Sequence, residues 1–247
     1  MKYIGSKNKH AKEILQFVLK NRKFNQYYVE PFIGGANIID KVQNPRIGND
    51  NNHYLIALLQ KLQEDWLPPK EITEEDYYEI KENQLYCSDA LLGYVGFQLS
   101  YGAKWFSGYR KDSEGFRNYS LEAFNNIANQ APLLKGIQLF CSDYRELEIP
   151  DNSIIYCDPP YENTINYQNE SFDHKIFWDW CRTKIKEGHS VFISEYSAPD
   201  DFVNLWGKTV CSSLSKNTGS KREIEKLFIH ETQIDNYYLE GFLNENL

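Results

Sequence analysis

The part of the chain best suited to chemistry is the run Asp158-Pro159-Pro160-Tyr161. Two successive prolines fix the backbone φ angle and remove two N–H donors, so the segment is stiff and rich in carbonyl acceptors. An exocyclic amino group on a flat heteroaromatic ring fits this set. Asp158 and the Pro159 carbonyl can each accept one N–H, and Tyr161 can stack on the ring. The alternative is a proline-rich turn with a surface tyrosine.

A buried strand is predicted directly before this run. Residues 154–157 follow a turn and are apolar and β-branched, so the strand is expected to end at the first proline. The carboxyl ends of strands are where open α/β sheets bind ligands. The polar residues 162–171 that follow are predicted to close over a substrate.

A second candidate site begins at Glu30, which ends a predicted strand over residues 27–30. The glycine-rich turn 31–37 follows and leads into a predicted helix with Ile38, Ile39 and Val42 on it. Such a turn lets the backbone approach a ligand closely, beside the positive end of a helix. The dinucleotide fingerprint Gly-x-Gly-x-x-Gly is not met.

Two further acidic residues end predicted strands. Asp50 follows the strand 46–49 and suits hydrogen bonding to the two hydroxyls of an adenosine ribose. Its alternative role is to cap the next helix, which Asn51 or Asn52 could cap instead. Asp143 follows the strand 137–141 and could meet an adenine amino group.

The opening residues predict a basic N-terminus and a capped helix. Gly5 permits a tight turn, and Ser6 can cap the helix that follows. The apolar face of that helix consists of Ile14, Leu15, Val18 and Leu19. In the functional alternative, Tyr3 and Lys7 lean over a ligand at the helix start.

Residues 100–119 differ sharply from the acidic stretch before them. Glycines interrupt the segment, and aromatic residues alternate with basic ones. A hairpin-like loop that offers cations to phosphates and rings to bases has this composition, although an irregular loop whose aromatics pack on the core would share it. The candidate DNA contacts are Lys104, Trp105, Tyr109, Arg110 and Arg117, with Lys216, Lys221 and Arg222 in a second cationic loop.

Composition narrows the class of protein. The 247 residues suffice for one large α/β domain with an inserted subdomain. A net charge of −8 argues against a protein that coats nucleic acid, but it permits a local basic patch. The five scattered cysteines indicate reduced thiols and no zinc site. Without a signal peptide or a bilayer-length apolar run, we expect a cytoplasmic protein with no membrane or metal partner.

Further elements are predicted from periodicity and turn residues. The expected helices cover residues 73–83, 88–99, 120–129 and 200–205, together with one capped by Asp173 that turns Phe177, Trp178 and Cys181 inward and ends at Gly188. The remaining expected strands cover residues 191–194, 209–214 and 226–230.

Taken together, these motifs resemble the DNA adenine methylase family, the Dam-like amino-methyltransferases of bacteria and phages. The matching pieces, in that family's order, are Tyr3-Ile4-Gly5-Ser6-Lys7, Glu30-Pro31-Phe32-Ile33-Gly34-Gly35, Asp50, Asp158-Pro159-Pro160-Tyr161 and Lys221-Arg222 with Lys226-Leu227-Phe228-Ile229. The chain departs at Ala36-Asn37, where a third small residue is more usual, which bears on cofactor affinity rather than cofactor identity.

The resemblance implies an α/β fold. A Rossmann-like methyltransferase sheet with helices on both faces would carry an inserted, mostly helical target-recognition subdomain with a hairpin-like loop. Residues 1–52 and 137–247 would form the S-adenosylmethionine-dependent catalytic domain. Residues 53–136 would form the inserted subdomain.

The resemblance also implies a site-specific methyltransferase, active as a monomer in a bacterial or phage-infected cytosol. It would move a methyl group from S-adenosylmethionine to N6 of a flipped adenine in double-stranded DNA, leaving S-adenosylhomocysteine. The implied cofactor contacts are Tyr3, Lys7, Glu30, Pro31, Phe32, Gly34, Asp50, Asp143, Tyr144 and Asp158. Asp158, Pro159 and Tyr161 would hold the target base, and the stretch 101–119 would enter DNA.

The chemistry agrees with this implication. An adenine amine is a poor nucleophile, because its lone pair is delocalised into the ring. Two acceptors out of the ring plane draw its hydrogens and aim the lone pair at an activated methyl, while Asp158 stabilises the nascent charge. The base must leave the duplex, and Tyr161 replaces part of the lost stacking. Carbon methylation of cytosine would need a nucleophilic cysteine, commonly in a Pro-Cys step, which the chain lacks.

Three alternatives stay open. They are an N4-cytosine methyltransferase, a catalytically inactive DNA-binding relative, and methyl transfer to RNA or to a protein glutamine. The aspartate that heads the motif favours adenine, and the presence of Asp50 and Asp158 favours catalysis. The aromatic and basic insert favours DNA.

Overall fold

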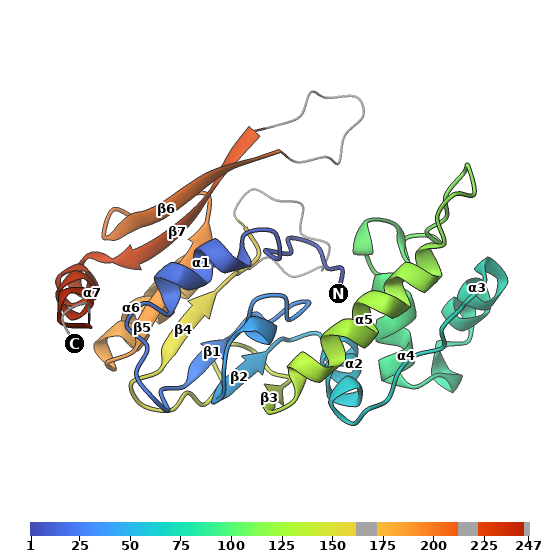
Figure 1. Ribbon diagram of the computed structural model, residues 1–247, viewed down its shortest axis with the longest axis horizontal. Coiled ribbons are helices and arrows are strands. Elements are labelled where there is room, and N and C mark those ends of the chain that lie inside the picture. Colours follow the sequence, from blue (N-terminus) through green and yellow to red (C-terminus); the bar gives the residue numbers. More distant parts are fainter. Residues whose placement is uncertain (162–171, 212–221, 245–247) are drawn as a thin grey trace. The chain divides into compact units, whose positions relative to one another are not determined.

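The structure is a computed structural model that describes residues 1–161, 172–211 and 222–244 (Figure 1). The chain forms two compact units, each described here by itself. The first consists of Met1–Ala11 and Phe32–Leu147, and the second of Lys12–Pro31 and Glu148–Leu247. The division into a catalytic domain and an insert over residues 53–136 stays a prediction.

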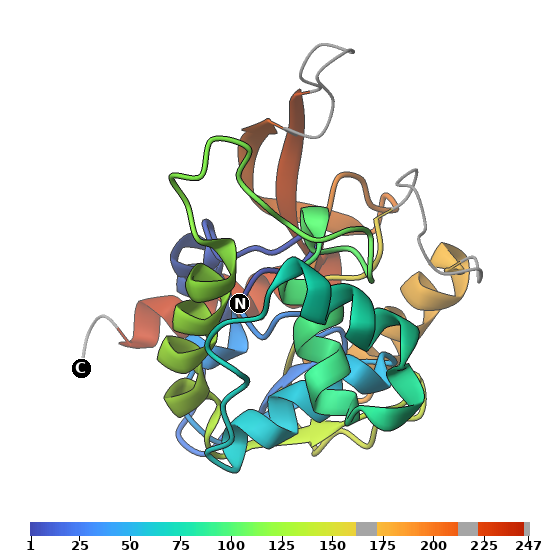
Figure 2. The ribbon, with the colours of Figure 1, turned by 90° about the vertical axis from the view of Figure 1, so that its right-hand side faces the viewer.

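The first unit combines two parallel strands with a group of helices. Strands β2 (Arg46–Asn49) and β3 (Ile137–Phe140) pair in parallel along their whole length. The helices and short helical turns are η1 (Ile39–Lys41), α2 (His53–Gln63), α3 (Glu74–Glu82), η2 (Gln84–Tyr86), α4 (Asp89–Gly93), η3 (Tyr94–Gln98), η4 (Tyr101–Ala103) and α5 (Tyr119–Leu134). Helix α2 lies against both α4 and α5 (Figures 1 and 2) and buries one apolar face, because its leucines recur at helical spacing.

The helix predicted around Ile38, Ile39 and Val42 is wrong in kind. Only the 3-10 turn η1 forms there, and Val42 after it is already extended. Part of the reason lies in the chain that follows, because Pro45 disfavours a helical conformation in the residue before it. The segment before the turn also bends, since Ala36 has a φ of 54°.

The acidic stretch folds largely as predicted. Helix α3 begins after Thr73, whose hydroxyl forms a capping box with Asp76, and α4 begins after Ser88. The expected helix 88–99 continues as the π-helical turn η3, which is buried throughout. These elements form the scaffold from which the 100–119 loop projects.

Helix α5 is longer than the predicted span 120–129. Asn118 caps its start, and it runs on to Leu134 although Pro132 lies inside it. Side chains from elsewhere in the first unit donate hydrogen bonds to the carbonyls at its C-terminal end. Arg46 donates to the Leu133 and Lys135 carbonyls, and Gln63 donates to the Leu134 carbonyl at 2.8 Å. These donors satisfy carbonyls that a helix end leaves without partners.

Within its described residues, the second unit contains five strands in the order β1-β4-β5-β7-β6. They are β1 (Tyr28–Glu30), β4 (Ile154–Cys157), β5 (Ser190–Glu195), β6 (Phe202–Cys211) and β7 (Arg222–His230). Strands β1, β4 and β5 are mutually parallel, while β7 runs antiparallel to both β5 and β6. The predicted strands 27–30, 154–157, 191–194 and 226–230 are confirmed.

The described helices of the second unit are α1 (Ala11–Val18, whose first residue is assigned to the first unit), α6 (His174–Lys186) and α7 (Glu231–Asn244). The predicted apolar face of α1 is buried at Ile14, Leu15 and Val18. As predicted, Asp173 caps α6 by accepting a hydrogen bond from Ile176 N at 3.0 Å. Helix α7 was not predicted.

The helix predicted over residues 200–205 is wrong. Strand β6 begins at Phe202, whose ring packs on Trp178 of α6 with centroids 4.7 Å apart. The alternation of buried and exposed residues is interrupted there by a register shift between Asn204 and Trp206. This bulge hides the strand's period of two, which is the signal that sequence reasoning requires.

Candidate active site and DNA interface

Asp50, which directly follows β2 in the first unit, holds the glycine-rich turn through its carboxylate. Its Oδ2 accepts a hydrogen bond from Gly34 N at 3.1 Å, and its Oδ1 accepts one from Asn52 N at 3.0 Å. Asn52 caps α2, so Asp50 does not serve as that cap. Desolvation raises the pKa of Asp50 to about 6, although the backbone N–H groups around it oppose the rise. The carboxylate is therefore oriented by the backbone and half-buried.

Tyr3 lies over the same glycine turn. A Cβ added at Gly34 would lie 3.0 Å from Tyr3 Cδ1, and one at Gly35 would lie 2.9 Å from Tyr3 Cβ, so these positions require glycine for a close approach. The Tyr3 ring meets Phe97 edge-on at 5.6 Å. Burial, and then the charge of Asp50, raises the pKa of Tyr3. The fold thus brings together two residues predicted from distant motifs.

The other N-terminal candidates have structural partners. Lys7 is buried, and its Nζ donates to the Gly5 carbonyl at 3.0 Å. Ser6 does not cap α1, contrary to the prediction, because a turn closed by His10 N and the Lys7 carbonyl separates it from the helix. Instead, the Ser6 hydroxyl accepts a hydrogen bond from Asn37 Nδ2 at 2.9 Å.

The residues after β3 form a small cluster with Phe32. The rings of Phe32 and Tyr144 lie 5.0 Å apart. Asp143 accepts two hydrogen bonds from the Arg145 guanidinium, each 2.8 Å long, and this pairing lowers the pKa of Asp143. A contact between Asp143 and an adenine amine would therefore compete with Arg145.

Glu30 and Pro31 belong to the second unit and are both buried. Glu30 accepts a hydrogen bond from the Tyr28 hydroxyl at 2.7 Å, from the same face of β1. Burial, followed by the charge of Glu30, raises the pKa of Tyr28. The Glu30 carboxylate is thus fixed by its own strand.

The Asp158 corner directly follows β4, all four residues of which are buried. Asp158 itself is half-buried, Pro159 is buried and Pro160 is exposed. Burial and then the charge of Asp158 raise the pKa of Tyr161. The carboxylate and the aromatic ring of the motif therefore lie near one another at the end of a buried strand.

Tyr161 is not a surface residue, since only 9% of it is exposed. Its hydroxyl donates to the carboxylate of Glu225 on β7, and its ring meets Tyr196 edge-on at 4.7 Å. Sequence reasoning missed Glu225. The available signal was its position along the strand. Glu225 is two residues before Leu227 and four before Ile229, so it lies on the same face of β7 as these buried residues.

The 100–119 loop is hairpin-like, as predicted, with an antiparallel bridge between Ser100 and Tyr109. Its aromatics have packing roles of their own. Trp105 stacks on Tyr54 at 4.5 Å and keeps 36% of its surface exposed. The Tyr109 hydroxyl donates to the Ile72 carbonyl at 2.8 Å. The contacts of both rings with DNA stay predictions.

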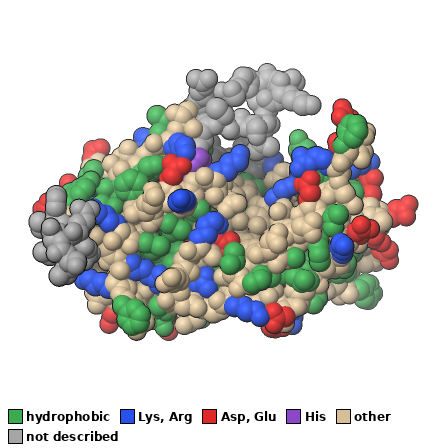
Figure 3. Space-filling model, in the orientation of Figure 1, with side chains coloured by type: hydrophobic (Ala, Val, Ile, Leu, Met, Phe, Trp, Pro, Cys, Tyr) green, Lys and Arg blue, Asp and Glu red, His purple; other side chains and the backbone are tan. Residues whose placement is uncertain are grey.

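The basic residues of this loop also have intramolecular partners. The Arg110 guanidinium lies 3.7 Å above the Tyr119 ring, and Arg117 forms two hydrogen bonds to Glu122 of 2.8 and 3.0 Å. In Figure 1 this loop projects from the chain directly preceding α5, and Figure 3, in the same orientation, shows basic side chains beside acidic ones over it. Lys104 is half-buried.

Several predictions from the sequence fall outside the described residues. They concern Lys216, Lys221, the side chain of Arg222 and the polar stretch 162–171.

The described strands and helices form a mixed α/β fold whose seven strands are mostly parallel. Acidic residues directly end or follow β1, β2 and β4, which is consistent with the Rossmann-like fold of a methyltransferase. Residues 3–235 match the model of the D12 class N6 adenine-specific DNA methyltransferase family, and the chain belongs to that family. No curated protein matches the chain.

The family settles the activity at the level of its class. The chain is an N6-adenine-specific DNA methyltransferase that depends on S-adenosylmethionine, as the resemblance predicted. DNA is its substrate. No helix within the described parts of the chain is long and apolar enough to cross a membrane.

Proposed function

We propose that Asp158, Pro159 and Tyr161 hold an adenine that has left the DNA duplex, and that they present its N6 amine for methylation. The observation that carries the proposal is the corner after β4. There a half-buried carboxylate lies near a tyrosine ring that Glu225 and Tyr196 hold in place. A rigid set of acceptors with a fixed ring suits a flat base that carries an amino group.

The chemical role of the corner follows from the amine. Asp158 and the Pro159 carbonyl accept the two N–H groups, which localises the nitrogen lone pair and directs it out of the ring plane. Asp158 then stabilises the positive charge that develops on nitrogen, and one N6 proton leaves to that carboxylate or to water as the neutral methylated amine forms. Bound S-adenosylmethionine supplies an activated methyl group on a sulfonium, so the protein's own contribution is position and electrostatics.

The residues of the first unit fit an adenosine. The Asp50 carboxylate is oriented by Gly34 N and Asn52 N, and an acidic residue there suits two ribose hydroxyls. The close packing of Tyr3 on Gly34 and Gly35 leaves backbone rather than side chains to line the methionine end. The proposed cofactor contacts are Tyr3, Lys7, Glu30, Pro31, Phe32, Gly34, Asp50, Asp143, Tyr144 and Asp158.

The 100–119 loop is proposed to contact double-stranded DNA. Lys104, Arg110 and Arg117 would meet phosphates or bases, and Arg110 and Arg117 would exchange their present partners Tyr119 and Glu122 to do so. Loops of this kind set the recognised sequence, while the fold sets the chemistry.

The decisive test compares the wild-type chain with Asp158→Ala. Loss of the acceptor should reduce methyl transfer by about 10³-fold or more, because the amine is no longer aimed or stabilised. Nucleoside chromatography of digested DNA measures the N6-methyladenine formed, and a gel-shift titration should show that duplex binding survives. Turnover retained by Asp158→Ala would refute the proposed role. Sequencing DNA from cells that express the wild-type chain, with modified adenines assigned to each site, gives the recognised sequence.

A further inference from the structure

We propose that two buried glutamines, Gln98 and Gln130, are positioning residues for the cofactor site. Each uses its side-chain amide to hold the main chain of a segment that carries proposed cofactor contacts. Gln98 holds the segment that contains Tyr3. Gln130 holds the part of the glycine-rich turn that begins at Gly34. The inference rests on the proposed cofactor roles of these two segments, and all of its contacts lie within the first unit.

Gln98 binds the backbone of Lys2 as a neighbouring strand would. Only 2% of Gln98 is exposed, and it ends the π-helical turn η3. Its Oε1 accepts a hydrogen bond from Lys2 N, and its Nε2 donates to the Lys2 carbonyl, both at 2.8 Å. Phe97, the neighbour of Gln98, meets the ring of Tyr3. The position of Tyr3 is therefore set by η3.

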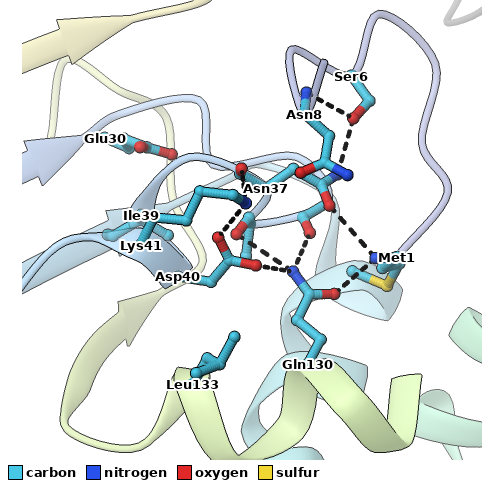
Figure 4. Close-up of polar contacts among 12 residues, drawn as sticks. Met1, Ser6, Asn8, Glu30, Asn37, Ile39, Asp40, Lys41, Gln130 and Leu133 are labelled. Atoms are coloured by element: carbon cyan, nitrogen blue, oxygen red, sulfur yellow. Dashed lines mark hydrogen bonds and ion pairs between the residues drawn. The ribbon is translucent and has the colours of Figure 1, made fainter. Parts of the chain in front are cut away.

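Gln130 reaches the glycine turn from α5, as Figure 4 shows. It is 4% exposed, and its Nε2 donates to the carbonyls of Gly35 and Ala36 at 3.0 and 3.2 Å. The same nitrogen donates to Asp40 Oδ2 at 2.9 Å. The amide oxygen accepts a hydrogen bond from the amino group of Met1.

The turn needs such a partner because its backbone conformation is unfavourable. Ala36 has a φ of 54°, a left-handed conformation that costs about 1–2 kcal/mol for a residue with a Cβ. The Gly35 and Ala36 residues are also buried, where a carbonyl without a donor is costly, and the Ala36 carbonyl has Asp40 N as a second donor at 3.3 Å. Gln130 donates to both carbonyls and so stabilises this conformation, in which Gly34 N donates to Asp50 Oδ2.

The consequence for function is pre-organisation. A ligand's apparent affinity falls in proportion to the fraction of molecules whose site is in the binding conformation. If loss of a glutamine leaves the segment correctly arranged about one-tenth of the time, cofactor binding weakens about tenfold. Turnover at saturating cofactor should change much less, because the glutamines hold segments proposed to bind the cofactor, whereas other residues are proposed to aim the amine.

The test uses Gln98→Met and Gln130→Met, which keep side-chain length and remove the amide. Isothermal titration with S-adenosylhomocysteine, at a temperature where circular dichroism shows folded protein, should give a dissociation constant about tenfold higher than wild type for each. Steady-state kinetics should show the same increase in KM for S-adenosylmethionine with kcat nearly retained. If either Met variant is not folded, Gln98→Asn or Gln130→Asn takes its place, because the shorter amide cannot reach the same carbonyls.

Gln63→Met is the matched control. Gln63 also uses its amide to donate to two backbone carbonyls of the first unit, those of Leu134 and Ile137, each at 2.8 Å. It holds no proposed cofactor segment, so its loss should lower Tm and leave the dissociation constant of S-adenosylhomocysteine as in wild type. A purely structural role for Gln98 and Gln130 predicts that they behave like Gln63, which would overturn the inference.

Asp50→Ala separates this inference from the proposed function. If Asp50→Ala weakens cofactor binding while both glutamine variants bind as wild type does, only the inference fails. If Asp50→Ala also binds as wild type does, the proposed cofactor site fails, and the inference fails with it.

Discussion

The corner at residues 158–161 and the turn at residues 32–37 both follow strands, but their shapes have different causes. The corner is stiff by covalent structure, since Pro159 and Pro160 fix their own φ angles. The turn contains two glycines and a left-handed Ala36, and side chains remote in sequence hold it. A corner of the first kind should keep its shape when a neighbouring side chain is removed. A turn of the second kind should lose its shape when a supporting side chain is removed, and its ligand affinity should fall.

The corner and the turn also differ in their proposed tasks. The proposed task of the corner is to aim a reacting nitrogen, for which small errors in position cost rate. The proposed task of the turn is to bind a cofactor, for which the fraction of correctly arranged molecules sets affinity. Substitutions at the corner should therefore lower kcat, and substitutions around the turn should raise the dissociation constant of the cofactor.

The largest expected effect in this comparison is at Tyr161. Tyr161→Ala removes the ring proposed to replace base stacking, which is worth about 1–3 kcal/mol per base and so corresponds to roughly a 10- to 100-fold lower rate. Tyr161→Phe keeps the ring and removes the hydroxyl that donates to Glu225, so the rate should fall much less. Single-turnover kinetics measure the rate, and the fluorescence of 2-aminopurine at the target position reports stacking of the extruded base.

Tyr237→Phe is the control for these variants. Tyr237 is a buried tyrosine of the second unit whose hydroxyl donates to the Phe17 carbonyl at 3.2 Å, and it has no proposed role in the reaction. Its variant should methylate as wild type does. If Glu225 acts only through the Tyr161 hydroxyl, Glu225→Gln should add no further loss to Tyr161→Phe. A full additive loss in the double variant would show that Glu225 acts elsewhere.

The next effect is the pH dependence of cofactor binding, which probes the turn through Asp50. The pKa of Asp50 is raised to about 6, so the carboxyl is protonated below that pH and can no longer accept from both ribose hydroxyls as a carboxylate does. One pH unit below the pKa, about one-tenth of the molecules are ionised, so affinity should be roughly tenfold weaker at pH 5 than at pH 7. Isothermal titration with S-adenosylhomocysteine across this range measures the change.

Stability runs in the opposite direction with pH, which separates the two effects. Because the folded-state pKa of Asp50 lies above its ordinary value of 3.8, the folded state binds this proton more tightly than the unfolded state does. The stabilisation from Asp50 is therefore complete below pH 3.8 and is lost as pH rises to about 6. Weaker cofactor binding at pH 5 cannot then come from unfolding driven by this group. Asp50→Asn should bind weakly at every pH in the range, and a remaining pH dependence in that variant would exclude Asp50 as its source.

Local stiffness and remote support also differ in how well they can be predicted from the sequence. The strand before Asp158 and the stiffness of the corner follow from adjacent residues, and both are predicted by local rules. The support of the glycine turn is not local, because Gln130 lies 94 residues from Ala36. An isolated glutamine in a helix gives no sign of its partner, so its role appears only once α5 is packed.

The errors have the same physical basis. The helix predicted at residues 200–205 contains apolar residues whose strand period is broken by the bulge between Asn204 and Trp206. The Tyr161 hydroxyl donates to Glu225, which lies 64 residues away, so the sequence near Tyr161 gives no sign of this partner. Only the position of Glu225 on the buried face of β7 could be predicted from the sequence. Propensity and periodicity thus give the elements, while tertiary contacts decide their ends and their partners.

The smallest expected effects are in the 100–119 loop, whose basic residues are proposed to contact DNA phosphates. Lys104→Ala should weaken duplex binding a few-fold and reduce the slope of log affinity against log salt by about 1, as expected for one phosphate contact. Arg117→Ala should cost less than the loss of a full phosphate contact. The two hydrogen bonds between Arg117 and Glu122 must be exchanged before it meets DNA, so part of its gain on binding is offset. Fluorescence anisotropy with a labelled duplex at several salt concentrations measures both quantities.

Lys61→Ala is the control for this series. Lys61 is an exposed lysine on α2 of the first unit, outside the loop, and pairs with Glu64 directly after that helix. Its loss should leave the salt slope unchanged. Glu122→Gln sharpens the contrast, because it weakens the hold on Arg117 and should make a subsequent Arg117→Ala change more costly for DNA binding. Equal salt slopes for Lys104→Ala, Arg117→Ala and Lys61→Ala would show that the loop makes no phosphate contact through these residues.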